Sequence, residues 1–213
     1  STAISDDLTT LPQLPRWVTS GRAETLETVA FLSGAALSHL HLVLSRDDVP
    51  QTLLRARLAL RAAEACVTYQ GRPERAADLR DAVAFLHPGG SPGPAGEVDL
   101  SLRRGIERPV SVNALHRALP DLEPEQIATW LDAGQGAPIS RVAGVLQTAL
   151  ADRPRDQTAA LVLADAALAQ SLGWTHVLPF LALGLTRADL RESDDELRLA
   201  CHRAITTGVV EVA

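Results

Sequence analysis

Several residue types are missing or scarce in this 213-residue chain. It contains no lysine and no methionine, so its 20 basic residues are all arginine, and aromatic residues make up only 3% of it. Alanine, leucine and valine supply most of the apolar content, which lets helices approach closely but stores less apolar area per residue. This balance favours a helical protein over a β-sandwich or a parallel sheet.

Positive charge is also in short supply. The formal net charge is -6, and there is no long basic run. Because binding to nucleic acid depends on neutralising phosphates, nucleic acid is not the expected partner of this segment alone. The N-terminus lacks the layout of a signal peptide, and no apolar run is expected to reach membrane-spanning length. We therefore expect a cytoplasmic protein without a membrane contact.

Cysteine occurs only at Cys66 and Cys201, each within a helical pattern. The spacing is neither a disulfide framework nor a zinc signature, and buried free thiols are expected. His39 and His41 cannot share a metal ion, because residues two apart on a helix point to nearly opposite sides. The pattern thus predicts no metal site, and no cofactor fingerprint is present.

The chain divides into an N-terminal arm over residues 1–20 and a single helical domain over 21–213. We expect the arm to be extended, with Trp17 docked onto the body. The apolar stripe of the first long helix is wide, which predicts burial of more than half of its surface. The clearest predicted helices span residues 23–44, 51–69, 74–86, 125–131, 138–150, 157–172 and 194–207. They predict an all-α fold, an irregular multi-helix bundle built from helical hairpins.

The segment HPGGSPGPAG at residues 87–96 interrupts this pattern and predicts a stiff loop. Glycine-rich loops that hold phosphate follow a strand and precede a helix N-terminus. Here a helix is expected before the loop, and no Gly-Lys-Ser or Gly-Lys-Thr follows it. The loop is therefore not expected to bind phosphate.

Short helices between residues 111 and 150 have the outline of a helix-turn-helix. The segment that would read DNA, EPEQIATWLD at 123–132, is acidic. A DNA-reading helix needs cationic and amide side chains facing the groove. We therefore interpret these helices as part of the bundle.

Asp165 is the most informative polar residue, because it interrupts the apolar stripe of the helix at 157–172. A buried carboxylate needs a partner, and Arg57, Arg61, His176 and His202 are the candidates. One interpretation is a structural ion pair; the other is a pocket carboxyl with a raised pKa. The candidate polar cluster comprises Arg57, Arg61, Glu64, Asp165, His176 and His202. None of them is assigned a catalytic role.

Two fairly specific segments carry a family resemblance: LRDAVAFLHPGGSPGPAG at 79–96 and LVLADAALAQSLGW at 161–174. On these motifs the chain resembles an uncharacterised family of bacterial helical proteins, known only as a domain of unknown function. The resemblance implies longer members that end in a segment similar to a winged helix, which these 213 residues lack. Consistent with this, the chain stops abruptly after Gly208, and we expect a further downstream region.

The leading functional hypothesis is a non-enzymatic cytoplasmic interaction or regulatory module with a protein partner or a second copy. It depends on the absence of a nucleophile–base pair, a metal spacing and a cofactor fingerprint. A DNA-associated transcriptional or plasmid-related regulator is one alternative. An enzyme or small-molecule receptor that uses the buried Asp/Arg/His cluster is the other.

Overall fold

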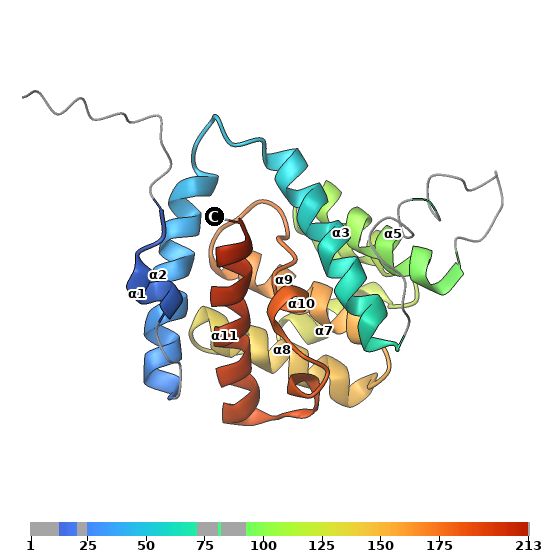
Figure 1. Cartoon of the computed structure of the whole chain (residues 1–213). Helices are drawn as coiled ribbons and strands as arrows, with labels where there is room; N and C mark the ends of the chain where they lie inside the picture. The colour runs from blue at the N-terminus through green and yellow to red at the C-terminus, as the bar shows by residue number, and fades with distance from the viewer. Residues whose placement is uncertain (1–12, 21–24, 72–80, 82–92, 213) are drawn as a thin grey trace, which may run out of the picture.

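The computed structural model of the protein describes residues 13–20, 25–71, 81 and 93–212. These residues form helices and connecting turns with no strand among them, which confirms the predicted all-α multi-helix bundle (Figure 1). The helices are α1 (Arg16–Ser20), α2 (Leu26–Leu44), α3 (Gln51–Tyr69), α5 (Gly93–Glu107), α6 (Val112–Ala118), α7 (Pro124–Leu131), α8 (Pro138–Asp152), α9 (Gln157–Ser171), α10 (Leu181–Gly184), η1 (Asp189–Arg191, a 3-10 turn) and α11 (Asp194–Val212).

Helix starts follow local capping signals. Thr25 Oγ1 accepts a hydrogen bond from the Thr28 amide at 3.2 Å, and Ser111 caps α6 in the same way. Pro124 and Pro138 occupy the first turns of α7 and α8, where a missing N–H costs no intrahelical bond. Helix α2 therefore begins at Leu26, after its cap, rather than at the predicted residue 23.

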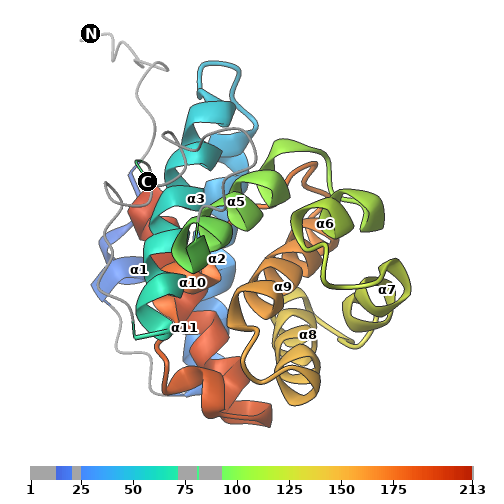
Figure 2. The ribbon, with the colours of Figure 1, turned by 90° about the vertical axis from the view of Figure 1, so that its right-hand side faces the viewer.

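Helix α9 forms the centre of the molecule. Helices α3, α5, α7, α8 and α10 pack against it, and Figure 2 shows it between α5, α6, α7 and α8. Twelve of its 15 residues are buried, on every side of the helix. The alanines among them let neighbouring helices approach closely, as the composition predicts.

Helix α2 lies at the edge of the molecule instead, packed mainly against α11 and α1 (Figure 1). Seven of its 19 residues are buried, fewer than the wide apolar stripe predicts. The helix is apolar on both sides, but its buried residues lie on the side that α11 covers, and α1 contacts the other side only in part.

The short helix α10 lies directly against α11. A Cβ atom placed on Gly184 would lie 2.4 Å from Ala204 Cα, far inside van der Waals contact. Only glycine therefore allows this backbone approach. The contact fixes the path of the chain between the central helix and the C-terminal helix.

The predicted loop at 87–96 differs from the structure at its end. Helix α5 begins at Gly93, so the last four residues of the segment are helical. Proline is tolerated in the first turn of a helix, which accommodates Pro94, and Ala95 and Gly96 are buried. The remainder of the loop, residues 87–92, lies outside the described residues.

The predicted arm also differs where it is described. Residues Arg16–Ser20 form the helix α1 rather than an extended segment, with Val18 buried. Trp17 stacks on Phe31 of α2 as the expected docking requires, but it remains 51% exposed. Residues 1–12 lie outside the described residues, as does the predicted helix 74–86 apart from Asp81, so the predicted hairpin with α3 stays a prediction.

Candidate functional site

Asp165 is the buried carboxyl that the sequence predicts, and it is only 1% exposed. Its Oδ1 accepts hydrogen bonds from the backbone amides of Phe180 and Leu181, each at 3.3 Å. Burial raises the pKa of Asp165 well above its ordinary value, although these two amides lower it. The carboxyl therefore anchors the start of α10 to the central helix.

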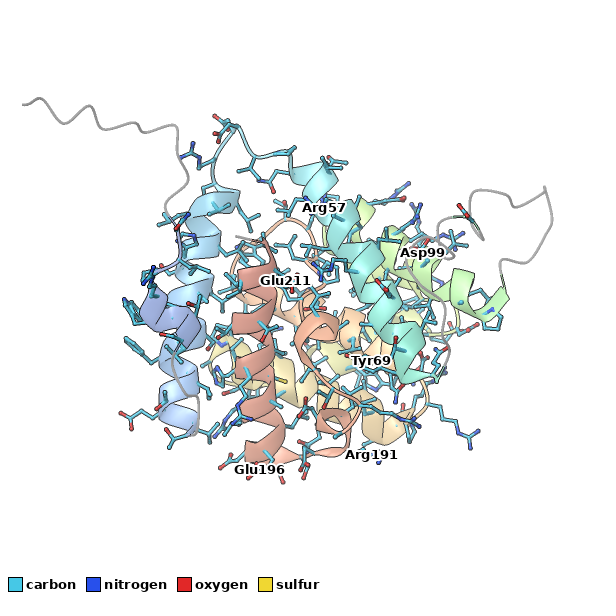
Figure 3. All side chains as sticks on the ribbon, in the orientation of Figure 1. Arg57, Tyr69, Asp99, Arg191, Glu196 and Glu211 are labelled. Carbon is cyan, nitrogen blue, oxygen red and sulfur yellow. The ribbon has the colours of Figure 1, made fainter. Side chains whose placement is uncertain are left out.

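Tyr69 holds the other end of the same turn. Its hydroxyl lies within hydrogen-bond distance of two carbonyl oxygens, those of Ala182 at 2.9 Å and of Leu185. Figure 3 labels Tyr69 near the end of α3, beside this segment. Burial raises the pKa of Tyr69 beyond its usual range, so it stays a neutral donor. Asp165 and Tyr69 together fix α10 at both ends.

The proposed side-chain partners of Asp165 are thus replaced by backbone amides. Arg61 instead forms an ion pair with Glu211 at the end of α11, and Figure 3 shows Glu211 on the side of α11 that faces α3. Arg57 is exposed at the surface of α3. The prediction of an arginine or histidine partner is wrong because the first amides of α10, which lack intrahelical acceptors, satisfy the buried carboxyl.

The other members of the predicted cluster also have separate partners. His176 Nδ1 lies 2.8 Å from Thr175 Oγ1, and His202 Nδ1 lies 2.6 Å from Ser33 Oγ. Glu64 is half-buried on α3 and forms no ion pair with another described residue. These side chains therefore lie in different local environments rather than in one hydrogen-bonded cluster.

Both cysteines are buried free thiols, as predicted. Burial raises the pKa of Cys66 and of Cys201 to about 12. Because the thiolate is the reactive form, neither thiol is activated at neutral pH. They pack as small core side chains.

Buried Ser33 and half-buried His202 form a second polar pair, between α2 and α11. Ser33 Oγ also lies 3.2 Å from the carbonyl oxygen of Ala30, to which it can donate. Burial, and next Arg198, lower the pKa of His202 to about 4. A histidine this acidic is a weak general base near neutral pH, so the pair is a poor nucleophile–base unit.

A cavity of about 640 Å³ adjoins this pair. It is bounded by α2, by the start of α8 and by the end of α9, and its walls are largely apolar. Its apolar lining residues include Leu37, Leu42, Ile139 and Leu172.

A second cavity, of about 430 Å³, is also lined by His41 and is more polar. His41 Nδ1 accepts a hydrogen bond from Trp174 Nε1 at 3.1 Å. Arg55 and His176 line the same cavity, which is walled further by Leu44 and by Leu178. Burial lowers the pKa of Arg55, and burial followed by Arg55 lowers that of His176.

The outer face of α2 carries the most exposed large apolar side chains among the described residues. Phe31 is 64% exposed and Leu42 is 63% exposed. The ring of Trp17 stacks on that of Phe31 with centroids 5.4 Å apart. These are the exposed large apolar side chains of α1 and α2 in a chain with few aromatics.

Helix α2 is also long and apolar enough to cross a membrane, by length and composition alone. The expectation that no apolar run reaches that length is therefore wrong. The polar positions within the run, such as Ser33 and His39, do not lower its mean hydropathy enough to disqualify it.

Asp99, in α5, is a buried carboxyl that the sequence did not single out. Its side chain is fully buried, and its Oδ2 lies 2.8 Å from Arg103 Nε one turn later. Burial raises the pKa of Asp99, whereas Arg103 lowers it. Figure 3 labels it on α5, away from α2. The i,i+4 spacing to Arg103 was the available signal.

Ser33, His41, Arg55 and Trp174 are further residues that sequence reasoning left without a site role. In the sequence, Arg55 stands beside apolar residues and looks like an ordinary surface arginine. The partners of the other three residues are set by tertiary packing, which the sequence does not reveal. Among the described residues, no group of three or more His, Cys, Asp or Glu side chains could hold a metal ion.

The chain belongs to the family described as Protein of unknown function (DUF1403), whose model matches residues 2–213. This confirms the resemblance to a domain-of-unknown-function family, and it leaves the function of the family open. Comparison with curated proteins and with solved structures found no match.

Proposed function

We propose that this member of a family without an assigned activity is a non-enzymatic helical interaction module that pairs with a second copy of itself through the outer face of α2. The observation that carries the proposal is the exposure of Phe31 and Leu42 on that face. Contiguous exposed apolar surface on a soluble domain marks an interaction site.

The exposed residues of α2 form one stripe along the helix. It contains one acidic residue and one histidine, and the other members are small or apolar. The stripe comprises Glu27, Ala30, Phe31, Gly34, Ser38, His41 and Leu42. Depletion of charge together with exposed aromatic side chains is typical of the core of an interface.

The stripe is self-complementary in an antiparallel arrangement. Phe31 and Leu42 lie three helical turns apart, roughly 16 Å along the axis. A two-fold axis midway between them brings Phe31 of one copy opposite Leu42 of the other, twice. Gly34 and Ser38 then lie near the axis, where small side chains let two helices approach. The two ends of the stripe therefore fit each other without a second kind of surface.

The apolar cavity beside α2 supports the same arrangement. Leu37 and Leu42 are among the α2 residues that line it, and Ile139 and Leu172 contribute apolar surface from the other elements. An apolar side chain of the second copy can enter this space and lose its contact with water. The cavity of one copy can therefore receive the Phe31 side chain of the other copy.

A lipid surface is a less suitable occupant. Helices that lie in a membrane interface carry lysine or arginine on their polar face, whereas α2 carries neither. Its opposite side is packed against α11, with Val29, Leu32 and Leu40 buried. A protein surface matches this helix better than an anionic membrane does.

Sedimentation equilibrium of the whole chain over a range of concentrations tests the proposal. We expect a dimer for the natural sequence and a dissociation constant at least about 10-fold higher for Phe31→Asp and for Leu42→Asp, because each buries a charge in the interface. Leu53→Asp is the matched control, since Leu53 is 59% exposed on α3 and should leave the dimer intact.

Two results would overturn the proposal. One is a monomeric natural chain at about 100 μM, where even a Kd of that size populates the dimer strongly. The other is a dimer that Leu53→Asp weakens as much as Phe31→Asp does. Flotation of the natural chain with phosphatidylcholine vesicles, lost in Phe31→Asp, would assign the face to lipid instead.

A further inference from the structure

The polar cavity between α2, α3 and the segment after α9 is lined by basic side chains beside apolar ones. Its lining contains three nitrogen-bearing side chains that can carry positive charge, His41, Arg55 and His176, and no carboxylate. The chain as a whole is acidic. Positive groups gathered in a hollow without an acid favour an anion there.

Arg55 is the main donor of this cavity. It forms no ion pair and no hydrogen bond with the described part of the chain, although it is partly buried on α3. By contrast, Arg61 on the same helix pairs with Glu211, and Arg103 on α5 pairs with Asp99. A guanidinium offers two parallel N–H groups to a carboxylate or a phosphate, so Arg55 is free to bind an anion in this way.

His41 contributes a second donor, and its tautomer follows from its contact. Trp174 Nε1 can only donate, so His41 Nδ1 must be the acceptor in the hydrogen bond between them. A neutral His41 therefore carries its proton on Nε2. The other polar groups of the lining already have partners: Gln51 Nε2 donates to the Leu44 carbonyl, and Ser45 Oγ donates to that of His41.

His176 lies near enough to Arg55 for the guanidinium to disfavour the charged imidazole. Two groups that repel each other when both are charged gain from an anion placed between them. The titratable groups that face the cavity are His41 from α2, Arg55 from α3 and His176 from the segment after α9. A bound anion would therefore draw a proton onto His176.

The remaining walls are apolar. Leu44, Trp174 and Leu178 line the cavity beside the cationic groups. Its volume of about 430 Å³ lies within the range of about 300–1,000 Å³ typical of small-molecule sites. The cavity thus suits a molecule with one anionic head and a compact apolar body.

We propose that this cavity binds a small organic anion, a carboxylate or a phosphate monoester, with its head on Arg55 and His176 and its body against Trp174, Leu44 and Leu178. The inference goes beyond self-association, because the site lies within one copy. His41 also belongs to the exposed stripe of α2, so the two sites are neighbours.

Isothermal titration calorimetry of the whole chain with benzoate, with phenyl phosphate and with neutral benzamide tests the site. We expect one molecule of benzoate or phenyl phosphate to bind per chain, and benzamide to bind at least about 10-fold more weakly. Binding of phenyl phosphate alone would identify phosphate as the head, and binding of benzoate alone would identify carboxylate.

Two matched variants locate the binding. Arg55→Gln should weaken binding of the anion at least about 10-fold, because it keeps a polar side chain but removes the guanidinium and its charge. Arg57→Gln should leave the affinity unchanged, since Arg57 is exposed on the same helix and does not line this cavity. Equal weakening by both variants would indicate a loss of general charge and overturn the proposal.

Proton uptake is a separate readout. NMR titration should show a higher pKa for His176 with the anion bound than without it, and a smaller rise in Arg55→Gln. No binding of either anion at about 10 mM would overturn the site. The monomeric Phe31→Asp variant should bind the anion as the natural chain does, which separates this test from the test of self-association.

Discussion

Helices α9 and α2 are both apolar along their whole length, but α9 lies in the interior of the molecule and α2 lies at its edge. Twelve of the 15 residues of α9 are buried, whereas seven of the 19 residues of α2 are. A helix that is apolar on all sides belongs in an interior. The surrounding helices of the same chain bury α9 on all sides. Helix α2 would be buried in the same way only if a second molecule covered its outer face.

The polar residues of the two helices show the same contrast. In α9, Asp165 is satisfied internally by the amides of Phe180 and Leu181. In α2, Ser33 is satisfied by His202 on the inner side, but Phe31 and Leu42 on the outer side contact water. The inner side of α2 is therefore packed and hydrogen-bonded like a protein core. The outer side is similarly apolar, but no other part of the described chain buries Phe31 and Leu42.

The largest effect should come from the core of α9. Leu163 is completely buried, so Leu163→Ala should lower the free energy of unfolding by about 2–5 kcal/mol through lost burial and a cavity. Phe31→Ala should change the stability of the dilute monomer by no more than about 0.5 kcal/mol. Chemical denaturation measures both, and equal costs would remove the contrast between the two helices.

Asp165 should give a pH-dependent effect of intermediate size. Its pKa is raised above the ordinary 3.8 in the folded chain, so the folded state holds a proton that the unfolded state loses. Stability from this group is therefore greatest below pH 3.8 and falls as the pH rises toward the folded pKa, by up to about 1.4 kcal/mol per pH unit.

Asp165→Asn keeps an oxygen acceptor for the two amides but cannot ionise. The variant should gain stability relative to the natural chain as the pH rises through this window, and the two should converge at low pH. Denaturation curves over a pH series measure the difference. A difference that widens toward low pH would contradict a neutral buried carboxyl at this position.

The sequence predicted the helices well where local signals mark them. The predicted helix 157–172 corresponds to α9 at Gln157–Ser171, and Pro138 begins α8 as expected. Capping residues and apolar spacing are local, so they can be read without a fold. The burial of Asp165 followed from the same spacing, because its position lies within the apolar stripe.

The partners of that carboxyl could not be predicted in the same way. They are backbone amides of a segment that packs onto α9 through tertiary contacts, and an amide leaves no mark on the residue type. Helix α2 presents the same difficulty in another form. Its apolar stripe indicates that both faces are suited to burial, but periodicity cannot say whether the cover comes from the same chain.

Gly34 offers the smallest and sharpest test, because it lies on the open face of α2. A Cβ atom there would meet nothing within 4 Å, and glycine inside a helix costs about 0.5–1 kcal/mol relative to alanine. Gly34→Ala should therefore stabilise the dilute chain by about that amount in denaturation experiments. If a second copy lies against this stripe, the same methyl group holds the two helices apart and should raise the dissociation constant in sedimentation by about 10-fold. A more stable monomer together with weaker association would show that the second copy contacts α2 at Gly34. A more stable monomer with unchanged association would show that the contact lies elsewhere.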